Sequence, residues 1–206
     1  MTIFNRMDIK YKLTDTQRDY LTELFNIGIG KASSVLSEML EKPVSLHIPE
    51  VSLVDIKEIS SELENLGYQN RSSVSLGMEG NVEGIMFLLF SDESAKEISK
   101  ALETDESDIN TVIEIANIVL NSVIGTFGNI LNEKIDYTSP VYSKKDISSQ
   151  VSTVIKNTQD KSFVLFANTF LSVESIQVET AILITIDLKS YSHLLSLVDK
   201  ITKGFS

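Results

Sequence analysis

The chain of 206 residues is long enough for one large domain, and its 42% hydrophobic and 23% charged residues are typical of a globular protein. Its formal net charge of −11 argues against a nucleic-acid-binding surface, because the phosphate backbone selects for clustered lysine and arginine. The absence of cysteine excludes disulfides, thiolate metal sites and thiol nucleophiles.

No uninterrupted run of about 18 apolar residues is present, and residues 1–12 lack the apolar core and cleavage site of a signal peptide. We therefore predict a cytoplasmic protein without membrane insertion, in which residues 1–13 form a short lead-in. The two histidines, His47 and His193, have no second histidine or cysteine near them in the sequence. This favours packing or surface roles over metal binding.

The first predicted element is a long helix over residues 14–40, where apolar residues recur at spacings of three and four. Thr14 as N-cap and Gln17 three residues later match a capping box. The helix should end just before Pro43, because a proline disfavours helical geometry in the residue that precedes it.

Two glycines lie inside this helix, Gly28 and Gly30, and each costs about 1 kcal/mol against alanine. This cost suggests a close backbone approach to a neighbouring element or to a docked partner. The segment from Gly28 to Ser33 superficially resembles a phosphate-binding loop. It lacks the spacing of that motif and lies within a helix, so we do not interpret it as a nucleotide site.

The rest of the chain follows one order of elements twice. After the first helix we predict a strand at 44–48, a short helical turn within 53–63, a hairpin of strands 72–78 and 84–90 turning at Gly80-Asn81, and a helix at 92–102. A second long helix at 106–132 is followed by a strand at 135–138, a polar stretch, strands at 162–171 and 177–186, and a helix at 188–201. We therefore predict one domain over 1–206 with internal repeats at about 14–102 and 106–203.

Polar residues on the two long helices keep the same register. On each helix three of them fall at offsets of 0, 4 and 7, which lie on one helical face, and a proline follows 23 residues after the last. The matching positions, each pair 91 residues apart, are Asp19 and Asn110, Glu23 and Glu114, Asn26 and Asn117, and Pro49 and Pro140.

These positions have two readings. A polar stripe on an amphipathic helix is usually a solvated face, and a proline that ends a strand needs no chemical purpose. Asparagine, however, is a mediocre helix former, and a fold needs neither Glu nor Asn on an exposed face. Two copies of the Glu-x-x-Asn pair therefore favour a function for Glu23, Asn26, Glu114 and Asn117.

The duplicated pattern Asp/Ser-x3-Glu-x2-Asn-x22-Pro resembles the CheC/CheX/FliY family of chemotaxis phosphatases, over about residues 14–203. The helices ELFNIGIGKASSVLSEML and EIANIVLNSVIGTFGNIL are similar to the two active-site helices of CheC. CheX typically keeps one copy and FliY continues into a further domain, so CheC is the better match. The pattern departs at Asn110, where the family has Asp or Ser, and at Lys31, where CheC-like sequences often have Asn.

This resemblance implies an α+β fold with pseudo-two-fold symmetry, in which an antiparallel sheet of about six strands carries the two long helices on one face. It also implies a substrate, the aspartyl phosphate of a phosphorylated CheY-like receiver domain. In this role Asn26 and Asn117 would orient the attacking water, and Glu23 and Glu114 would pair with a lysine of the receiver. Asp19, Asn110, Pro49 and Pro140 would support these residues.

The same resemblance leaves other functions open. The chain could act mainly as an adaptor that senses phosphorylated CheY and binds the receptor deamidase CheD, or it could serve a receiver outside chemotaxis. In each case we expect a monomer without a cofactor of its own, and Mg²⁺ on the receiver. The absence of a cysteine or an obvious histidine nucleophile disfavours covalent catalysis.

Overall fold

The computed structural model of the chain describes residues 12–55, 57–65, 67–68, 71–101, 109–144, 147, 149–151, 162–173 and 176–204. Within these ranges the elements follow one another as α1 (Asp15–Leu40), β1 (Val44–His47), β2 (Val51–Asp55), α2 (Ile59–Asn65), β3 (Ser72–Gly80), β4 (Gly84–Phe90), α3 (Asp92–Ala101), α4 (Ile109–Leu131), β5 (Ile135–Tyr137), β6 (Val141–Ser143), β7 (Ser162–Val173), β8 (Ile176–Asp187) and α6 (Leu188–Gly204).

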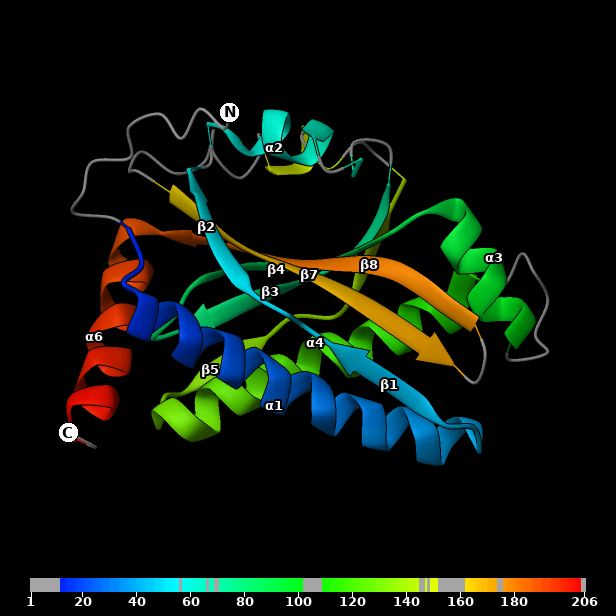
Figure 1. Cartoon of the computed structure of the whole chain (residues 1–206). Helices are drawn as coiled ribbons and strands as arrows, with labels where there is room; N and C mark the ends of the chain where they lie inside the picture. Colours follow the sequence, from blue (N-terminus) through cyan, green and yellow to red (C-terminus); the bar gives the residue numbers. More distant parts are fainter. Residues whose placement is uncertain are drawn as a thin grey trace.

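The eight described strands form one antiparallel sheet in the order β1-β7-β8-β4-β3-β5. β2 also pairs with β7 and β6 with β3, so each edge of the sheet is shared by two short strands. In Figure 1 the sheet is curved, α1 and α4 lie together below it, and α2 lies on the opposite side. The predicted α+β class, with two long helices on one face of an antiparallel sheet, is confirmed.

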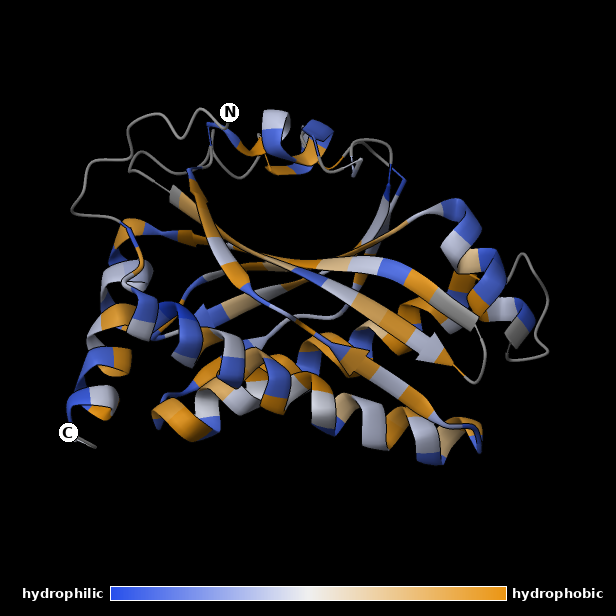
Figure 2. Cartoon of the chain, in the orientation of Figure 1, coloured by the Kyte–Doolittle hydropathy of each residue, from blue (hydrophilic) through white to orange (hydrophobic). Residues whose placement is uncertain are grey.

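Both faces of the central strands are covered, which explains why β4 is apolar at nearly every position. Met86, Leu88 and Phe90 belong to the larger core, which includes the buried faces of α1 and α4. Phe87 and Leu89 point the other way, into a second core under α2. Alternate residues of a strand face opposite sides of the sheet, so a strand that is covered on both sides has hydrophobic residues at successive positions. Figure 2 shows hydrophobic segments, in orange, along the strands of the sheet.

The strand order is symmetric about its centre: β1 takes the same place at one edge as β5 at the other, β7 the same as β3, and β8 the same as β4. Each half thus donates its short edge strand to the other, β1 to β7 and β5 to β3. The helices α1 and α4 end at Leu40 and Leu131, and the next residues, Glu41 and Asn132, both have positive φ, 51° and 53°. A duplicated unit would produce this symmetry, although the boundaries of the repeats stay a prediction.

Two strands were not predicted from the sequence. Residues 51–55 form β2, where we expected a mixed stretch leading into a helical turn, and residues 141–143 form β6 within the stretch taken as polar. Both are short edge strands whose pairing depends on the long strands β7 and β3 in the other half of the chain. Local periodicity carries little of that information. The predicted start of the second long helix, 106–108, and most of the lead-in lie outside the described residues.

The start of α1 is as predicted. The Thr14 hydroxyl accepts a hydrogen bond from the Gln17 backbone N–H at 3.2 Å, and the Gln17 side-chain oxygen accepts one from the Thr14 N–H at 2.9 Å. The Gln17 Nε2 also donates to Asp199 of α6 at 2.8 Å. The capping box therefore both begins α1 and fixes it against the last helix.

The two glycines in α1 were expected to mark a close approach of the helix backbone to a neighbouring element, and one of them, Gly28, does so. A Cβ on Gly28 would lie only 2.8 Å from the Cα of Val123, so α1 and α4 touch at the level of their backbones there. A Cβ on Gly30 would have nothing within 4 Å. The helix crossing therefore accounts for Gly28 but not for Gly30.

By length and composition, α4 is apolar enough to cross a membrane, and half of its most apolar window is buried inside the fold. Its buried residues pack in the same core as α1 and the sheet. A core helix shared between two layers has this composition for packing reasons alone. The prediction of no membrane insertion stays a prediction.

Two buried tyrosines make the stability of the fold sensitive to alkaline pH. The Tyr68 hydroxyl bonds to Glu179 and to the Thr180 carbonyl, both at 3.1 Å, and the Tyr191 ring packs 4.6 Å from that of Phe163. Burial raises the pKa of both hydroxyls above the usual 10.0, and the nearby Glu179 carboxylate adds to the rise at Tyr68. The folded chain therefore keeps these protons at pH values where the unfolded chain loses them.

We expect the free energy of unfolding to fall as the pH rises above about 10, by about 1.4 kcal/mol per pH unit for each of these tyrosines. Denaturant unfolding at a series of pH values measures this slope. In Tyr68→Phe the slope should be smaller, because one of the two linked protons is gone. An unchanged slope in that variant would contradict the assignment to Tyr68.

Candidate functional site

The predicted polar stripes lie at the surface of the two long helices. On α1, Asp19 and Glu23 are exposed and Asn26 is half-buried. The α4 stripe has the same gradient, from exposed Asn110 and Glu114 to half-buried Asn117. In both helices the carboxylate is thus open to a partner, while the amide lies one turn further on and is less exposed.

The first stripe borders an open groove of about 370 Å³ between α1 and the connection from β1 to β2. Four carboxylates and one guanidinium line it, so the groove is mainly acidic. It brings together three of the predicted site residues and four that the sequence did not indicate; in chain order its residues are Asp15, Arg18, Asp19, Thr22, Glu23, Pro49 and Glu50.

The side chain of Arg18 bridges two of the carboxylates in this groove. The Arg18 guanidinium lies 3.4 Å from Glu50 on one side and 3.2 Å from Asp15 on the other. Within the described residues, neither Asp19 nor Glu23 forms a hydrogen bond or an ion pair. Their carboxylates are therefore available to a cationic group of a partner.

Small polar side chains of α1 bind the backbone of the edge strands. Asn26 does so twice: its Nδ2 donates to the Ile48 carbonyl at 2.8 Å and its Oδ1 accepts from the Ile48 N–H at 3.0 Å. Thr22 accepts from the Val51 N–H at 3.1 Å, on the other side of Pro49. The Asn26 amide is thus held in one orientation beside Pro49.

Further along α1 the same row continues with two serines. Ser33 accepts from the Leu46 N–H at 3.1 Å, and Ser37 accepts from the Val44 N–H at 2.9 Å. Positions 22, 26, 33 and 37 lie on one face of the helix, so together they fasten β1 and the start of β2 to α1. An edge strand has one side without a neighbouring strand, and these side chains satisfy its backbone groups there.

The second helix lacks this row. The positions 91 residues after Thr22, Ser33 and Ser37 are Ile113, Ile124 and Gly128, which have no side-chain hydrogen-bonding group. Asn117 has a different partner, because its Oδ1 accepts from the Nδ2 of Asn121 at 2.9 Å. Within the described residues, no hydrogen bond is found for the Asn117 Nδ2. The two predicted sites therefore hold their amides by different means.

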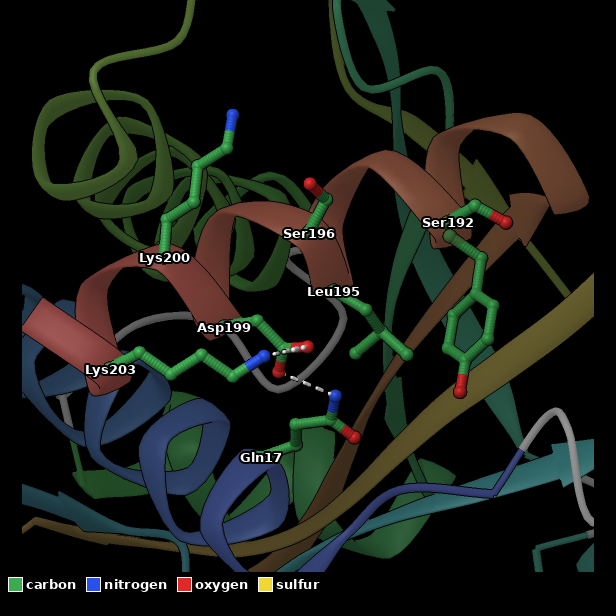
Figure 3. Close-up of a pocket in the computed structure, with 8 residues that line it drawn as sticks. Gln17, Ser192, Leu195, Ser196, Asp199, Lys200 and Lys203 are labelled. Carbon is green, nitrogen blue, oxygen red and sulfur yellow. Dashed lines mark hydrogen bonds and ion pairs between the residues drawn. The ribbon is translucent and has the colours of Figure 1, made fainter.

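A second hollow, of about 480 Å³, lies between α6 and the start of α1. Figure 3 shows Asp199 between Gln17 and Lys203, with a hydrogen bond of 2.8 Å to the first and an ion pair of 3.6 Å to the second, while Lys200 points away. None of the predicted site residues lies here. The Gln17–Asp199 bond joins α1 to α6, whereas the Lys203–Asp199 pair lies within α6, and we interpret both as part of the fold.

The two histidines lie on different elements, His47 on β1 and His193 on α6. His193 lies 3.0 Å from the Glu133 carboxylate, which is only 10% exposed and sits just after the end of α4. His47 is exposed on β1. Within the part of the chain that the structure describes, no group of three metal-ligating side chains comes together.

Sequence comparison finds no matching family model but does find curated relatives. The chain is 22% identical over 141 residues to the putative CheY-P phosphatase CheC1 of Halobacterium salinarum and 26% identical over 132 residues to the CheY-P phosphatase CheC of Bacillus subtilis. These matches cover 63% and 64% of this chain. They span 71% of the first relative and 59% of the second.

Comparison of structures gives similar folds over nearly the whole chain. FliY of Thermotoga maritima matches with a TM-score of 0.72 at 18% identity, over 91% of this chain and 98% of the other. The FliM middle domain of H. pylori matches with a TM-score of 0.65 at 11% identity, over 90% and 99%. The solved structures show that the fold is similar. The two sequence relatives agree, at low identity, with the resemblance to CheC-type chemotaxis phosphatases that the duplicated motif indicates.

Proposed function

We propose that the chain hydrolyses the aspartyl phosphate of a phosphorylated CheY-like receiver domain. The observation that carries this proposal is the pairing, on each long helix, of an exposed Glu with an oriented Asn amide one turn away. The names of the two curated relatives, a putative CheY-P phosphatase and a CheY-P phosphatase, support the same reaction.

The substrate needs little chemistry from the phosphatase. An acyl phosphate is already reactive, and the receiver supplies its own divalent cation and lysine. The phosphatase then has two tasks: it places a water molecule in line with phosphorus, and it holds the two proteins in a fixed relative position. Positioning of this kind is the main contribution of proteins to phosphoryl transfer. We therefore propose that the chain uses no metal of its own and that Mg²⁺ stays on the receiver.

Each residue of the pair suits one of these tasks. Asn26 and Asn117 donate and accept hydrogen bonds without titrating, so they would orient the water rather than act as bases. Glu23 and Glu114 are exposed carboxylates, and each would bind the receiver lysine. At the first site the acidic groove beside Pro49 adds Asp19 as a further anionic group close to Glu23.

Turnover separates this proposal from the adaptor alternative. The full chain is added in substoichiometric amount to a phosphorylated receiver, and phosphate release is followed. We expect many phosphates per molecule of chain. Binding without faster release, with or without CheD present, would contradict the phosphatase and favour the adaptor.

Replacing Glu23 and Glu114 together by Gln is expected to raise the KM for the phosphorylated receiver about tenfold, the factor that corresponds to about 1.4 kcal/mol of lost charge pairing. The kcat should change less, because the amides stay in place. Added salt should raise the KM of the parent chain more than that of the variant. Glu38→Gln, at an exposed position further along α1, is the matched control.

Equal losses in the double variant and in Glu38→Gln would show that only general surface charge matters. A fall in kcat at unchanged KM would show that the carboxylates act in the chemical step and not in binding the receiver.

A further inference from the structure

Asn121 lies one helical turn beyond Asn117 on α4, and its hydrogen bond is directed at the predicted site. The Asn121 Nδ2 donates to the Asn117 Oδ1 at 2.9 Å. Both side chains are half-buried. This bond leaves the Asn117 Nδ2, with its two N–H groups, as the free end of that amide.

The side-chain oxygen of Asn121 destabilises the fold, and no hydrogen bond compensates for its burial. This atom, Oδ1, is buried and has no hydrogen-bond partner. A buried polar atom without a partner costs about 1–3 kcal/mol, and Asn within a helix costs a few tenths more than Ala. Reversing the Asn121 amide alone would place its oxygen against the Asn117 oxygen and break the bond between the two side chains.

The first half of the chain has no such residue. The position 91 residues before Asn121 is Gly30, and the Asn26 amide is held by the Ile48 backbone instead. That arrangement uses both the oxygen and the nitrogen of Asn26, whereas the α4 arrangement uses only the oxygen of Asn117. The two sites therefore present different groups to a partner.

We propose that Asn121 is a positioning residue of the α4 site, which fixes the Asn117 amide so that its Nδ2 faces the attacking water. This inference rests on the proposed function. An N–H donated to the water oxygen occupies one lone pair and leaves the other for phosphorus. As the oxygen–phosphorus bond forms, the bond from phosphorus to the aspartyl oxygen breaks, the receiver regains its carboxylate, and the water protons leave with inorganic phosphate.

The test uses the full chain carrying Asn26→Ala, so that phosphate release from a phosphorylated receiver comes from the α4 site. Adding Asn121→Ala is expected to lower kcat about 10- to 100-fold at unchanged KM, the size of effect that follows from small misplacement of a reacting group. Its melting temperature should not fall, because the substitution removes the unpartnered Oδ1. Asn129→Ala, at an exposed position of the same helix, should leave both quantities unchanged.

A second variant tests orientation directly. In Asn121→Asp the side chain keeps its size but can only accept, so the Asn117 amide must turn its Nδ2 inward and present its oxygen to the water. We expect the same loss of kcat as in Asn121→Ala. A variant that kept its turnover would overturn the proposal.

The remaining outcomes are also decisive. Loss of kcat together with a matching loss of stability in Asn121→Ala would make Asn121 a structural residue and overturn the inference. So would an inactive Asn26→Ala chain beside an active parent, because the α4 site would then contribute nothing. If the parent chain itself released no phosphate from the receiver, the proposed function would be contradicted.

Discussion

Replacing both amides, in Asn26→Ala/Asn117→Ala, is expected to lower the rate of phosphate release from the phosphorylated receiver by about 100-fold or more, since both water-positioning groups are lost. Each single variant should keep the turnover of the other site. The measurement is release of inorganic phosphate with each of the three variants at saturating receiver. The spontaneous hydrolysis of the receiver sets the floor of the assay.

Folding must be measured in the same variants, because Asn26 also holds the chain together. Without its side chain the N–H and carbonyl of Ile48, a fully buried residue, lose their partner, which costs about 1–3 kcal/mol. Ser37→Ala is the matched control, since it removes the bond to the Val44 N–H further along the same helix. It should lose stability and keep activity. Full activity in the double variant would show that the amides have other roles.

The sequence left open whether Asn26 is present for the fold or for function, and the structure shows that it has a role in the fold. A residue that binds the backbone of an edge strand has a structural reason to be there. The same reason does not extend to Asn117, whose hydrogen-bond partner among the described residues is the side chain of Asn121, or to Glu23, which is exposed. The repeat therefore points to function most strongly where the fold offers no explanation.

Motif spacing found the stripes because helical periodicity places offsets of 4 and 7 on one face whatever the fold around them. It could not find Arg18 and Glu50, because these come together, from α1 and from the connection between β1 and β2, only once that connection lies along α1. Ser33 and Ser37 were missed for a related reason. A serine in a helix looks like a weak helix former until the strand that it binds is known.

Helix capping and chain order were predictable because the signals are local. Thr14 and Gln17 are three residues apart, and the turn after α1 is set by the residues beside Pro43. The pairing of β2 with β7 joins residues more than 100 positions apart. No pattern within either segment specifies that partner, so β2 and β6 appeared only in the structure.

The glycines of α1 provide a pair of variants with opposite expected effects on stability. In Gly28→Ala the new methyl would lie 2.8 Å from the Val123 Cα and 3.3 Å from the Ser122 carbonyl oxygen. These are backbone atoms, so no rotamer change relieves the contact and the two helices must separate. Overpacking of this kind costs about 1–3 kcal/mol, while Gly30→Ala, which meets nothing, should gain up to about 1 kcal/mol of helix propensity.

Thermal unfolding measures both effects, at about 2–4 °C per kcal/mol for a chain of this size. A gain of stability in Gly28→Ala would contradict the close packing of α1 and α4. Activity then separates two pictures of the site. Asn26 is fixed by the Ile48 backbone and Asn117 by a residue of its own helix, so two independent sites should each survive a small separation of α1 from α4. A single site formed across both helices would lose turnover in Gly28→Ala, with the chain still folded.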